Sequence, residues 1–199
     1  MQLNVYETYV YGNYTYKNFV NLSEDELLTI LEWRNHPNIR KCMNNTAVIA
    51  VETHLNFVRG LHTRNDVSYW QVSVGKRPVG VLNIIDIDML SRTCEPGFYL
   101  APEAMGKGEG LFFLYNYKSF LLNELGFDKL IGHNYLDNMS ALQFTLFFGA
   151  QIVDILEIDG RKSIRTILER SSFNEIDSHR LLSQYVGFIR RWDIDSILK

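Results

Sequence analysis

The sequence predicts a mixed α/β fold (an α+β mixed sheet), in which an antiparallel meander continues into one β-α-β crossover and closes with a C-terminal hairpin. Three observations carry this prediction. Two apolar runs, residues 69–74 and 79–87, are joined by a short turn, as in a β-hairpin. A strand ending at Leu100 then leads through a glycine-rich loop and a helix to a further strand at residues 130–135. Such a crossover is normally right-handed and makes its two strands parallel. The third observation is a late turn signal, Asp159-Gly160.

The N-terminal part alternates strand and helix signals. Tyrosines interleaved with valines and threonines over residues 6–16 favour β structure, and Gly12-Asn13 breaks it into a hairpin. Residues 23–26 form a capping box that opens a helix. This helix ends near Pro37, because proline disfavours helical geometry in the residue before it. After a short helical piece, residues 52–61 predict a further amphipathic helix.

The remaining elements follow in the order that a crossover and a hairpin require. The helix after the glycine loop runs through Leu125 and ends at Gly126, a typical left-handed cap. Asp137 or Asn138 caps the next helix. The expected elements are a strand at residues 130–135, a helix at 140–148, strands at 150–158 and 163–168, and a last helix at 174–188.

Composition excludes several classes of function. The chain has 199 residues, of which 46% are hydrophobic and 22% charged, so it can bury a full core. A formal net charge of −3 without a block of Lys or Arg argues against a nucleic-acid partner. The sequence lacks a run of about 18 apolar residues, so a membrane partner is not expected either. No basic segment precedes an apolar run at the N-terminus, so we expect a cytoplasmic protein. Cys42 and Cys94 stand apart from any metal-ligand spacing, so we expect no metal.

Three alternating glycines form the most informative motif of the chain. Gly106, Gly108 and Gly110 remove side chains from a loop at the entrance to a helix, where several backbone N–H groups can turn toward one anion. Leu111 follows where a P-loop has lysine, and the spacing differs from the Gly-x-Gly-x-x-Gly of dinucleotide-binding folds. The loop is therefore either a pyrophosphate site or only a tight connection.

The order of elements and two motifs resemble the GNAT family of acyl-CoA N-acyltransferases over most of residues 14–170. Residues 105–110 are a version of the Arg/Gln-x-x-Gly-x-Gly/Ala loop, and Asn138-x-x-Ala141 opens the following helix. The resemblance implies the GNAT fold with splayed parallel strands, a single domain at 1–172 with a helical extension at 173–199, and acetyl-CoA as cosubstrate. Methionine replaces the family's Arg or Gln at 105, so one phosphate contact is expected to be missing. The implied acetyl-CoA ligands are Leu100, Met105, Gly106, Lys107, Gly108, Glu109, Gly110 and Asn138.

A second stretch resembles one branch of that family, the bacterial N-acetyltransferases of pseudaminic acid biosynthesis. Residues 31–43, followed by Thr53-His54-Leu55-x-Phe57, carry this likeness. These enzymes acetylate the 4-amino group of a UDP-linked deoxy sugar, so the implied partner is a small-molecule amine, a UDP- or dTDP-amino sugar. By position, the residues implied to face the nucleotide are Arg34 and His54, and those implied to wall the sugar are Met43, Phe57 and Tyr99.

Several of these residues also have a purely structural interpretation. Arg34 and Arg40 could pair with Glu32 or Asp25 at the surface. His54 could be a solvated residue at a helix start. The tyrosine-rich N-terminus favours a sheet surface or the contact of a homodimer over a stacking platform for nucleic acid.

Direct acetyl transfer needs a neutral amine, a polarised thioester carbonyl and a proton for the departing thiolate. A backbone N–H on the strand ending at Leu100 can polarise the carbonyl. His133 can accept the amine proton unless it packs under a helix on the other face of its strand, and Asn83 can hold a relay water. Members of the family commonly have tyrosine where Thr145 stands, so the expected proton donor is Tyr135 or water.

The leading hypothesis is an acetyl-CoA-dependent N-acetyltransferase that acetylates a nucleotide-linked amino deoxy sugar by direct attack in a ternary complex, without a covalent enzyme intermediate. One alternative is an N-acetyltransferase of a protein N-terminus or a small amine. The other is a catalytically inert CoA-binding module, which Met105 and Thr145 would favour.

Overall fold

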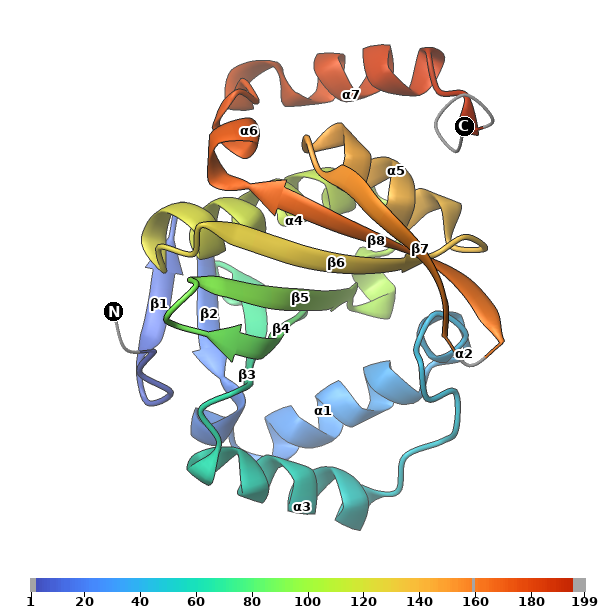
Figure 1. The fold of residues 1–199 in the computed structure, drawn as a ribbon. Coiled ribbons are helices and arrows are strands. Elements are labelled where there is room, and N and C mark those ends of the chain that lie inside the picture. Colours follow the sequence, from blue (N-terminus) through green and yellow to red (C-terminus); the bar gives the residue numbers. More distant parts are fainter. Residues whose placement is uncertain (1–2, 159, 195–199) are drawn as a thin grey trace. The chain divides into compact units, whose positions relative to one another are not determined.

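The computed structural model describes residues 3–158 and 160–194. The chain divides into two compact units, Met1–Leu130 and Ile131–Lys199, and the division falls inside strand β6 (Lys129–Tyr135). Figure 1 shows that each unit contains both strands and helices. Asp159, half of the late turn signal, lies outside the described residues.

The first unit is built on an antiparallel meander whose strands pair in chain order. Gly12 (φ +60°) and Gly75 (φ +59°) supply the left-handed backbone of its two tight hairpin turns. β6 joins the last of these strands in parallel, with Leu130 opposite Cys94, so the predicted mixed sheet and crossover are confirmed. The antiparallel strands are β1 (Thr8–Tyr11), β2 (Tyr14–Asn18), β3 (Ser68–Val74), β4 (Arg77–Asp88) and β5 (Thr93–Leu100).

Three helices lie between β2 and β3. Helix α1 (Glu24–Asn35) begins at the predicted capping box, in which Ser23 and Glu26 each accept a hydrogen bond from the other's backbone N–H. It ends before α2 (Pro37–Arg40), and α3 (Val51–Gly60) lies one residue from its predicted range. Residues 41–50, which form neither helix nor strand, are called the 41–50 segment below. Figure 1 shows α1 and α3 along one face of the strands of this unit, the α1/α3 face.

Alternate side chains of the strands serve the two faces of this unit. Val81 of β4 belongs to a buried cluster with Ile30 of α1 and Val58 of α3. Its neighbour Leu82, which is also fully buried, points to the opposite face by strand alternation. The α1/α3 face therefore carries every second residue of β4, beginning from Val81.

The helix that follows the glycine loop differs in part from the prediction. α4 (Glu109–Ser119) continues into a π-helical turn, Phe120–Glu124, where the sequence predicts one uniform helix. Phe120 is fully buried, and its ring stacks on that of Tyr16 with 4.1 Å between centroids. The wider turn accompanies this aromatic contact, which local periodicity cannot reveal. Gly126 (φ +72°) adopts the predicted left-handed conformation after the turn.

The second unit pairs its strands in the order β6-β8-β7. β7 (Gln151–Ile158) and β8 (Arg161–Glu169) form the predicted antiparallel hairpin. Between β6 and β7 lies α5 (Met139–Phe147), which is followed by Gly149 with a φ of +90°. The element types of this unit up to β8 are those that the sequence predicts.

The tail is not the single helix predicted at 174–188. It forms α6 (Arg170–Asn174), a 3₁₀ turn at Ser178–Arg180 and α7 (Leu181–Arg190). The Asp177 carboxylate accepts a hydrogen bond from the His179 N–H and starts the new turn, a local bond that competes with helix continuation. None of the helices in the part of the chain that the structure describes is long and apolar enough to cross a membrane.

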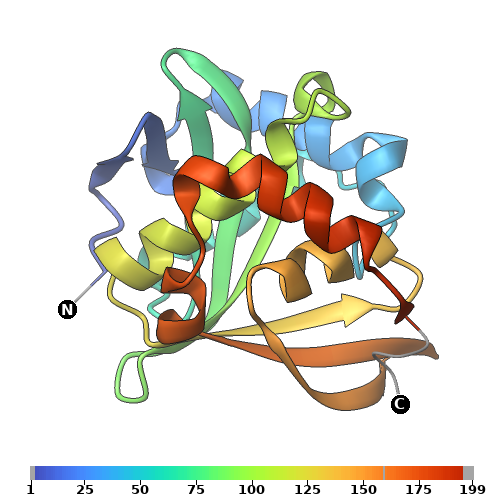
Figure 2. The same cartoon turned by 90° about the horizontal axis from the view of Figure 1, so that it is seen from above.

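Aromatic rings hold α7 against α5 within the second unit. Tyr185 stacks on Phe144 with 4.9 Å between centroids, and Phe188 meets Phe147 at 5.6 Å. Figure 2 shows α7 beside α5. Phe173, one residue beyond the domain boundary expected at 172, is 1% exposed and lies 5.9 Å from Phe148. The division into residues 1–172 and an extension stays a prediction.

Candidate active site

The glycine loop connects β5 to α4 with an open backbone. Gly106 (φ +74°) and Gly108 (φ +77°) both lie in the left-handed region, and no atom stands within 4 Å of a Cβ built on either. Gly110 is helical, and a Cβ there would make an ordinary contact with Leu100 at 3.7 Å. Met105 and Lys107 are exposed. Backbone geometry therefore favours glycine at 106 and 108, whereas at 110 it does not.

The N-terminus of α4 is left uncapped by side chains. Gly108 is the N-cap residue and has no side chain to offer, so the first backbone N–H groups of the helix lack the usual cap. Glu109 could compete with an anion there, but its carboxylate pairs with Arg77 of β4 at 2.9 Å. A helix N-terminus in this condition favours an anion, so the loop fits a pyrophosphate.

Asn83 lies on the α1/α3 face of β4, two residues from Val81. It stands opposite Gly97 of β5, and a Cβ on Gly97 would come within 2.7 Å of the Asn83 Oδ1 atom. Glycine at 97 therefore makes room for this carboxamide. Tyr99 is the next residue of β5 on the same face.

Several of the aromatic and apolar residues singled out for the acceptor pack on the α1/α3 face. Met43, Tyr69 and Tyr99 all pack against the core cluster of the α1/α3 face. The ring of Phe57 meets Tyr69 edge-on, with 5.1 Å between centroids. Burial raises the pKa of Tyr99, and the nearby Arg34 partly opposes this effect. Met43 and Tyr99 thus pack against one cluster, and Phe57 is linked to that cluster through Tyr69, which no sequence motif indicates.

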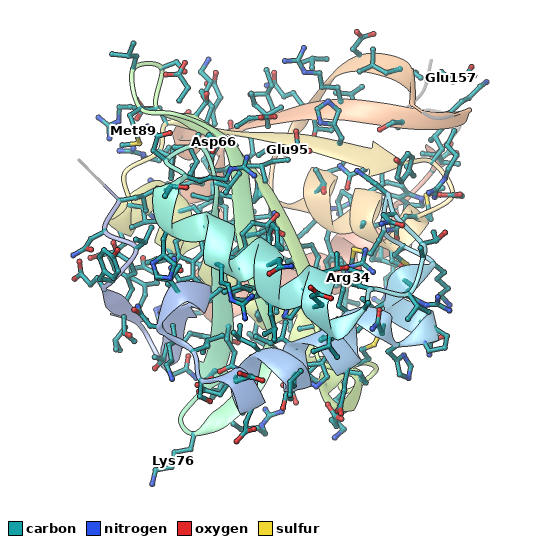
Figure 3. The ribbon with its side chains drawn as sticks, turned by 90° about the horizontal axis from the view of Figure 1, so that it is seen from below. Arg34, Asp66, Lys76, Met89, Glu95 and Glu157 are labelled. Atoms are coloured by element: carbon teal, nitrogen blue, oxygen red, sulfur yellow. The ribbon has the colours of Figure 1, made fainter. Side chains whose placement is uncertain are left out.

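Arg34, labelled in Figure 3, comes from the last turn of α1. Its Nη2 donates to the backbone carbonyl of Asn45 at 2.7 Å, and its Nη1 is buried without a hydrogen-bond partner. Burial lowers the pKa of this guanidinium, Tyr99 raises it, and Arg40 lowers it further. The surface pairing with an acidic neighbour is absent from the ion pairs of the described residues. The guanidinium is therefore oriented by the backbone and keeps one donor for another group.

His54 lies in the interior of the first unit. Its side chain is 6% exposed, and its ring meets Phe19 edge-on at 6.5 Å between centroids. Burial lowers the pKa of the imidazole, and the carbonyl of Leu27 partly opposes that effect. The interpretation of His54 as a solvated helix end is wrong. The structure gives this residue a packing role, and its contact with a nucleotide stays a prediction.

The two faces of β6 carry different chemistry within the second unit. Thr145 of α5 donates a hydrogen bond to the Asn134 carboxamide at 3.3 Å, so Asn134 faces α5. Side chains alternate along a strand, so His133 and Tyr135 project from the opposite face. His133 is exposed, which rules out the interpretation that it packs under a helix. The hydroxyl of Thr145 thus donates its hydrogen bond to a side chain of the same unit, which is a structural role.

Arg161 of β8 holds the ring of Tyr135. Its guanidinium lies 3.6 Å from the ring centroid, and one of its nitrogens donates to both carboxylate oxygens of Asp137 at 2.7 and 2.8 Å. Asn138 begins α5, but its side chain forms no capping bond with the helix. Of the two caps that the sequence left open, Asp137 and Asn138, the N-cap position falls to Asn138, but the predicted side-chain capping bond is not formed.

Comparison with known proteins decides the family. No protein-family model matches the chain. Two curated proteins, both named Acetyltransferase PseH, come from Campylobacter jejuni subsp. jejuni serotypes O:2 and O:23/36. They are 34% and 32% identical to this chain over 127 residues, which cover 64% of this chain and 78% of each relative. The chain belongs to the GNAT acetyltransferases.

Solved structures show that the fold of this GNAT acetyltransferase is shared. The crystal structure of Campylobacter jejuni N-acetyltransferase PseH is 23% identical, with a TM-score of 0.63 over 79% of this chain and 99% of that one. The same protein in complex with acetyl coenzyme A is 24% identical, with a TM-score of 0.61 over 78% and 98%. A Vibrio cholerae spermidine N-acetyltransferase in complex with CoA and spermine is 18% identical, with a TM-score of 0.71 over 81% and 98%.

Membership of the GNAT acetyltransferases establishes the coarse activity of the chain. It is an acetyl-CoA-dependent N-acetyltransferase, as the sequence resemblance implied. The inert CoA-binding module is thereby set aside. Among the residues that the structure describes, no three His, Cys, Asp or Glu side chains gather as a metal site.

Three residues of this GNAT acetyltransferase gain a functional interest from the structure that the sequence did not give them. They are Tyr69, which supports the apolar group at Tyr99, Arg40, which lies close to Arg34, and Arg161, which holds Tyr135. Tyr69 has a weak sequence signal, since it lies in the strand predicted to pair with the strand of Asn83; the observed register places the two residues opposite each other. Arg161 has none, because its partners belong to other elements.

Proposed function

We propose that the chain transfers the acetyl group of acetyl-CoA to the amine of a nucleotide-linked amino deoxy sugar. Its curated relatives carry the name of the PseH acetyltransferases, and pseudaminic acid biosynthesis is the pathway that the sequence resemblance implies. The observation that carries the acceptor class is the arrangement at the end of β5, where an arginine with a free donor lies beside an apolar group. These two features suit a phosphate-bearing ligand with a methyl group.

Acetyl-CoA binds through the glycine loop in this proposal. The open N–H groups at residues 106–110 hold the pyrophosphate, and the helix N-terminus of α4 favours its charge. Lys107 adds positive charge, whereas Met105 adds none, so the backbone supplies most of the binding. Leu100 and the carboxamide of Asn138 contact the pantetheine arm.

The acceptor sugar binds on the α1/α3 face near Tyr99. Met43, Phe57 and Tyr99 wall the sugar, and Arg34 faces the nucleotide. An apolar wall suits a sugar that has a methyl group in place of a hydroxyl, because burying an unpaired hydroxyl costs free energy. Arginine suits a diphosphate because its planar guanidinium donates in pairs.

The chemical step is direct attack. The neutral amine attacks the thioester carbonyl carbon, the C–S bond breaks, and the CoA thiolate leaves. His133 accepts the amine proton directly or through a water held by Asn83, and Tyr135 gives a proton to the thiolate. Within the second unit, the contact with Arg161 orients the Tyr135 ring for this role.

A CoA-release assay tests the proposal. The purified enzyme is given acetyl-CoA and, in turn, a UDP-linked amino deoxy sugar, spermidine and a peptide with a free N-terminus. We expect CoA release only with the nucleotide sugar, and Arg34→Ala should raise the acceptor KM while sparing that of acetyl-CoA. Arg64→Ala, which removes an exposed arginine paired with Asp66, is the matched control. Release with the peptide or spermidine alone would contradict the proposal.

The homodimer expected from the sequence also stays a prediction. The N-terminal tyrosines that suggested it lie on and near β1, an edge strand of the first unit with Tyr6 and Val10 exposed. Sedimentation at several concentrations distinguishes a dimer from a monomer. A Val10→Glu variant should weaken the dimer if β1 forms the contact.

A further inference from the structure

Two arginines of the first unit lie close together without a negative partner. Arg34 comes from α1 and Arg40 from α2, and the two guanidiniums donate to the carbonyls of two successive residues, Asn45 and Thr46. Neither takes part in an ion pair among the described residues. Two like charges in a partly buried place repel each other, so this pair is unfavourable without an anion.

Backbone carbonyls orient both guanidiniums but leave one buried nitrogen of each without a hydrogen-bond partner. Arg34 donates through Nη2 to the carbonyl of Asn45 at 2.7 Å, and Arg40 donates through Nη1 to that of Thr46 at 3.2 Å. The Nη1 atom of Arg34 and the Nε atom of Arg40 are buried without a partner. A buried N–H group without an acceptor is costly, and a neutral carbonyl does not balance a charge.

We propose that Arg34 and Arg40 together bind a phosphate or diphosphate group of the acceptor, with Arg40 as a second cationic residue beside the arginine already implied. A dianion between them would accept from both unused donors and balance both charges. This inference rests on the proposed function, because it takes the acceptor amine to be carried by a phosphorylated molecule. It also excludes a class of acceptor. Polyamines such as spermidine are cations and would be repelled by the same pair.

The 41–50 segment lies against this site, because its Asn45 and Thr46 carbonyls accept hydrogen bonds from the two guanidiniums. The two unused donors are shut off from water. Side chains of α1 and α2 attach it by hydrogen bonds, which include a reciprocal pair between the Asn35 carboxamide and the backbone of Ile49. An anion that reaches the donors displaces part of this segment. Binding should therefore raise the amide hydrogen exchange of residues 44–48.

The test is a calorimetric titration of the full chain with inorganic pyrophosphate and with UDP. The protein is first saturated with CoA, so that the glycine loop is occupied and cannot bind the probe. We expect both probes to bind, and Arg40→Gln to weaken them by about ten- to a hundredfold. Arg40→Lys should retain more affinity than Arg40→Gln. Arg59→Ala, which removes an exposed arginine bonded to Asn56 in the same unit, should bind both probes like the natural protein.

The choice of glutamine separates charge from structure. Glutamine keeps an N–H group that can hold Thr46 but carries no charge, so a residue that only attaches the 41–50 segment would tolerate it as well as lysine. Equal affinities of Arg40→Gln and the natural protein for pyrophosphate and UDP would overturn the inference. So would an absence of binding of either probe to the CoA-saturated natural protein.

Turnover assays distinguish this inference from the proposed function. If the enzyme acetylates the UDP-linked amino sugar but Arg40→Gln changes neither binding nor acceptor KM, the inference fails and the proposed function stands. If both probes bind in an Arg40-dependent way while the nucleotide sugar is not acetylated, the phosphate site stands and the proposed acceptor is wrong. Acetylation of spermidine with an unchanged rate in Arg40→Gln would overturn both.

Discussion

Gly108 offers the sharpest test of the anion-binding interpretation of the glycine loop. Its φ of +77° lies in the left-handed region, and nothing stands within 4 Å of a Cβ built there. Alanine at this position therefore meets no clash and costs only backbone strain, about 1–2 kcal/mol. In a chain of about 200 residues such a loss lowers Tm by roughly 2–8 °C.

Acetyl-CoA affinity should fall by more than this strain explains. The strained residue relaxes by turning its peptide groups, and the loop N–H groups then no longer converge on one point. Each charge-assisted hydrogen bond to phosphate that is lost is worth about 1.5–3 kcal/mol. We therefore expect Gly108→Ala to weaken acetyl-CoA binding by about ten- to a hundredfold.

The control is Gly75→Ala in the β3–β4 hairpin. Gly75 also has a left-handed φ, +59°, and open space around its Cβ position, so alanine strains the backbone there as well. Thermal unfolding measures the stability of both variants, and calorimetric titration measures their acetyl-CoA affinity. We expect both to lose stability and only Gly108→Ala to lose affinity. Natural affinity in Gly108→Ala, or an equal loss in Gly75→Ala, would refute the reasoning.

Three further predictions concern catalysis, pH and packing. Tyr135→Phe should lower kcat by about 10²- to 10⁴-fold in steady-state kinetics, as expected for loss of a general acid. Thr145→Val should change kcat only a few-fold, because the Thr145 hydroxyl is hydrogen-bonded to Asn134. A larger loss in Thr145→Val than in Tyr135→Phe would show that Tyr135 is not the acid. Burial lowers the pKa of His54 from 6.5, so the unfolded chain binds a proton more readily than the folded chain, and the free energy of unfolding falls as the pH drops below about 6.5. Urea unfolding between pH 5 and 7.5 measures how steeply this free energy changes with pH. The change should be less steep in His54→Gln, and an equally steep change would contradict the reasoning. Leu82→Ala should reduce the free energy of unfolding by about 2–5 kcal/mol, because Leu82 is fully buried. Val10→Ala, at an exposed position, is the control and should reduce it by less than about 0.5 kcal/mol. Similar losses in the two variants would show that burial does not determine the size of the loss.

Local patterns account for the parts of the fold that could be predicted. The capping box at Ser23 and Glu26, the proline that ends α1 and the left-handed Gly126 each act within a few residues. The π-helical turn at Phe120 and the break in the tail at Asp177 could not be predicted in this way. The first accompanies an aromatic contact with Tyr16, far away in the chain, and the second depends on one side-chain hydrogen bond that outweighs helical periodicity.

The residues of the candidate site also differ in whether the sequence alone could reveal their role. The glycine loop was recognisable because its chemistry belongs to its own backbone, although the sequence could not show that Gly110 is helical while Gly106 and Gly108 are left-handed. Arg34 was recognisable only by resemblance. Its unused donor, and the nearby Arg40, depend on how α1, α2 and the 41–50 segment pack.

By itself, the sequence determined the order of the elements up to β8 and the open loop before α4, because periodicity, caps and glycine spacing are local properties. The mixed sheet followed from the strand–helix–strand crossover, and the acetyltransferase family followed from resemblance. The tertiary structure alone decided that His54 is buried, that His133 and Tyr135 share the face of β6 turned away from α5, and that two arginines keep unused donors. These facts depend on which distant segments shield a side chain from water or supply its hydrogen-bond partner. Burial and pairing of this kind are set only when the chain has folded.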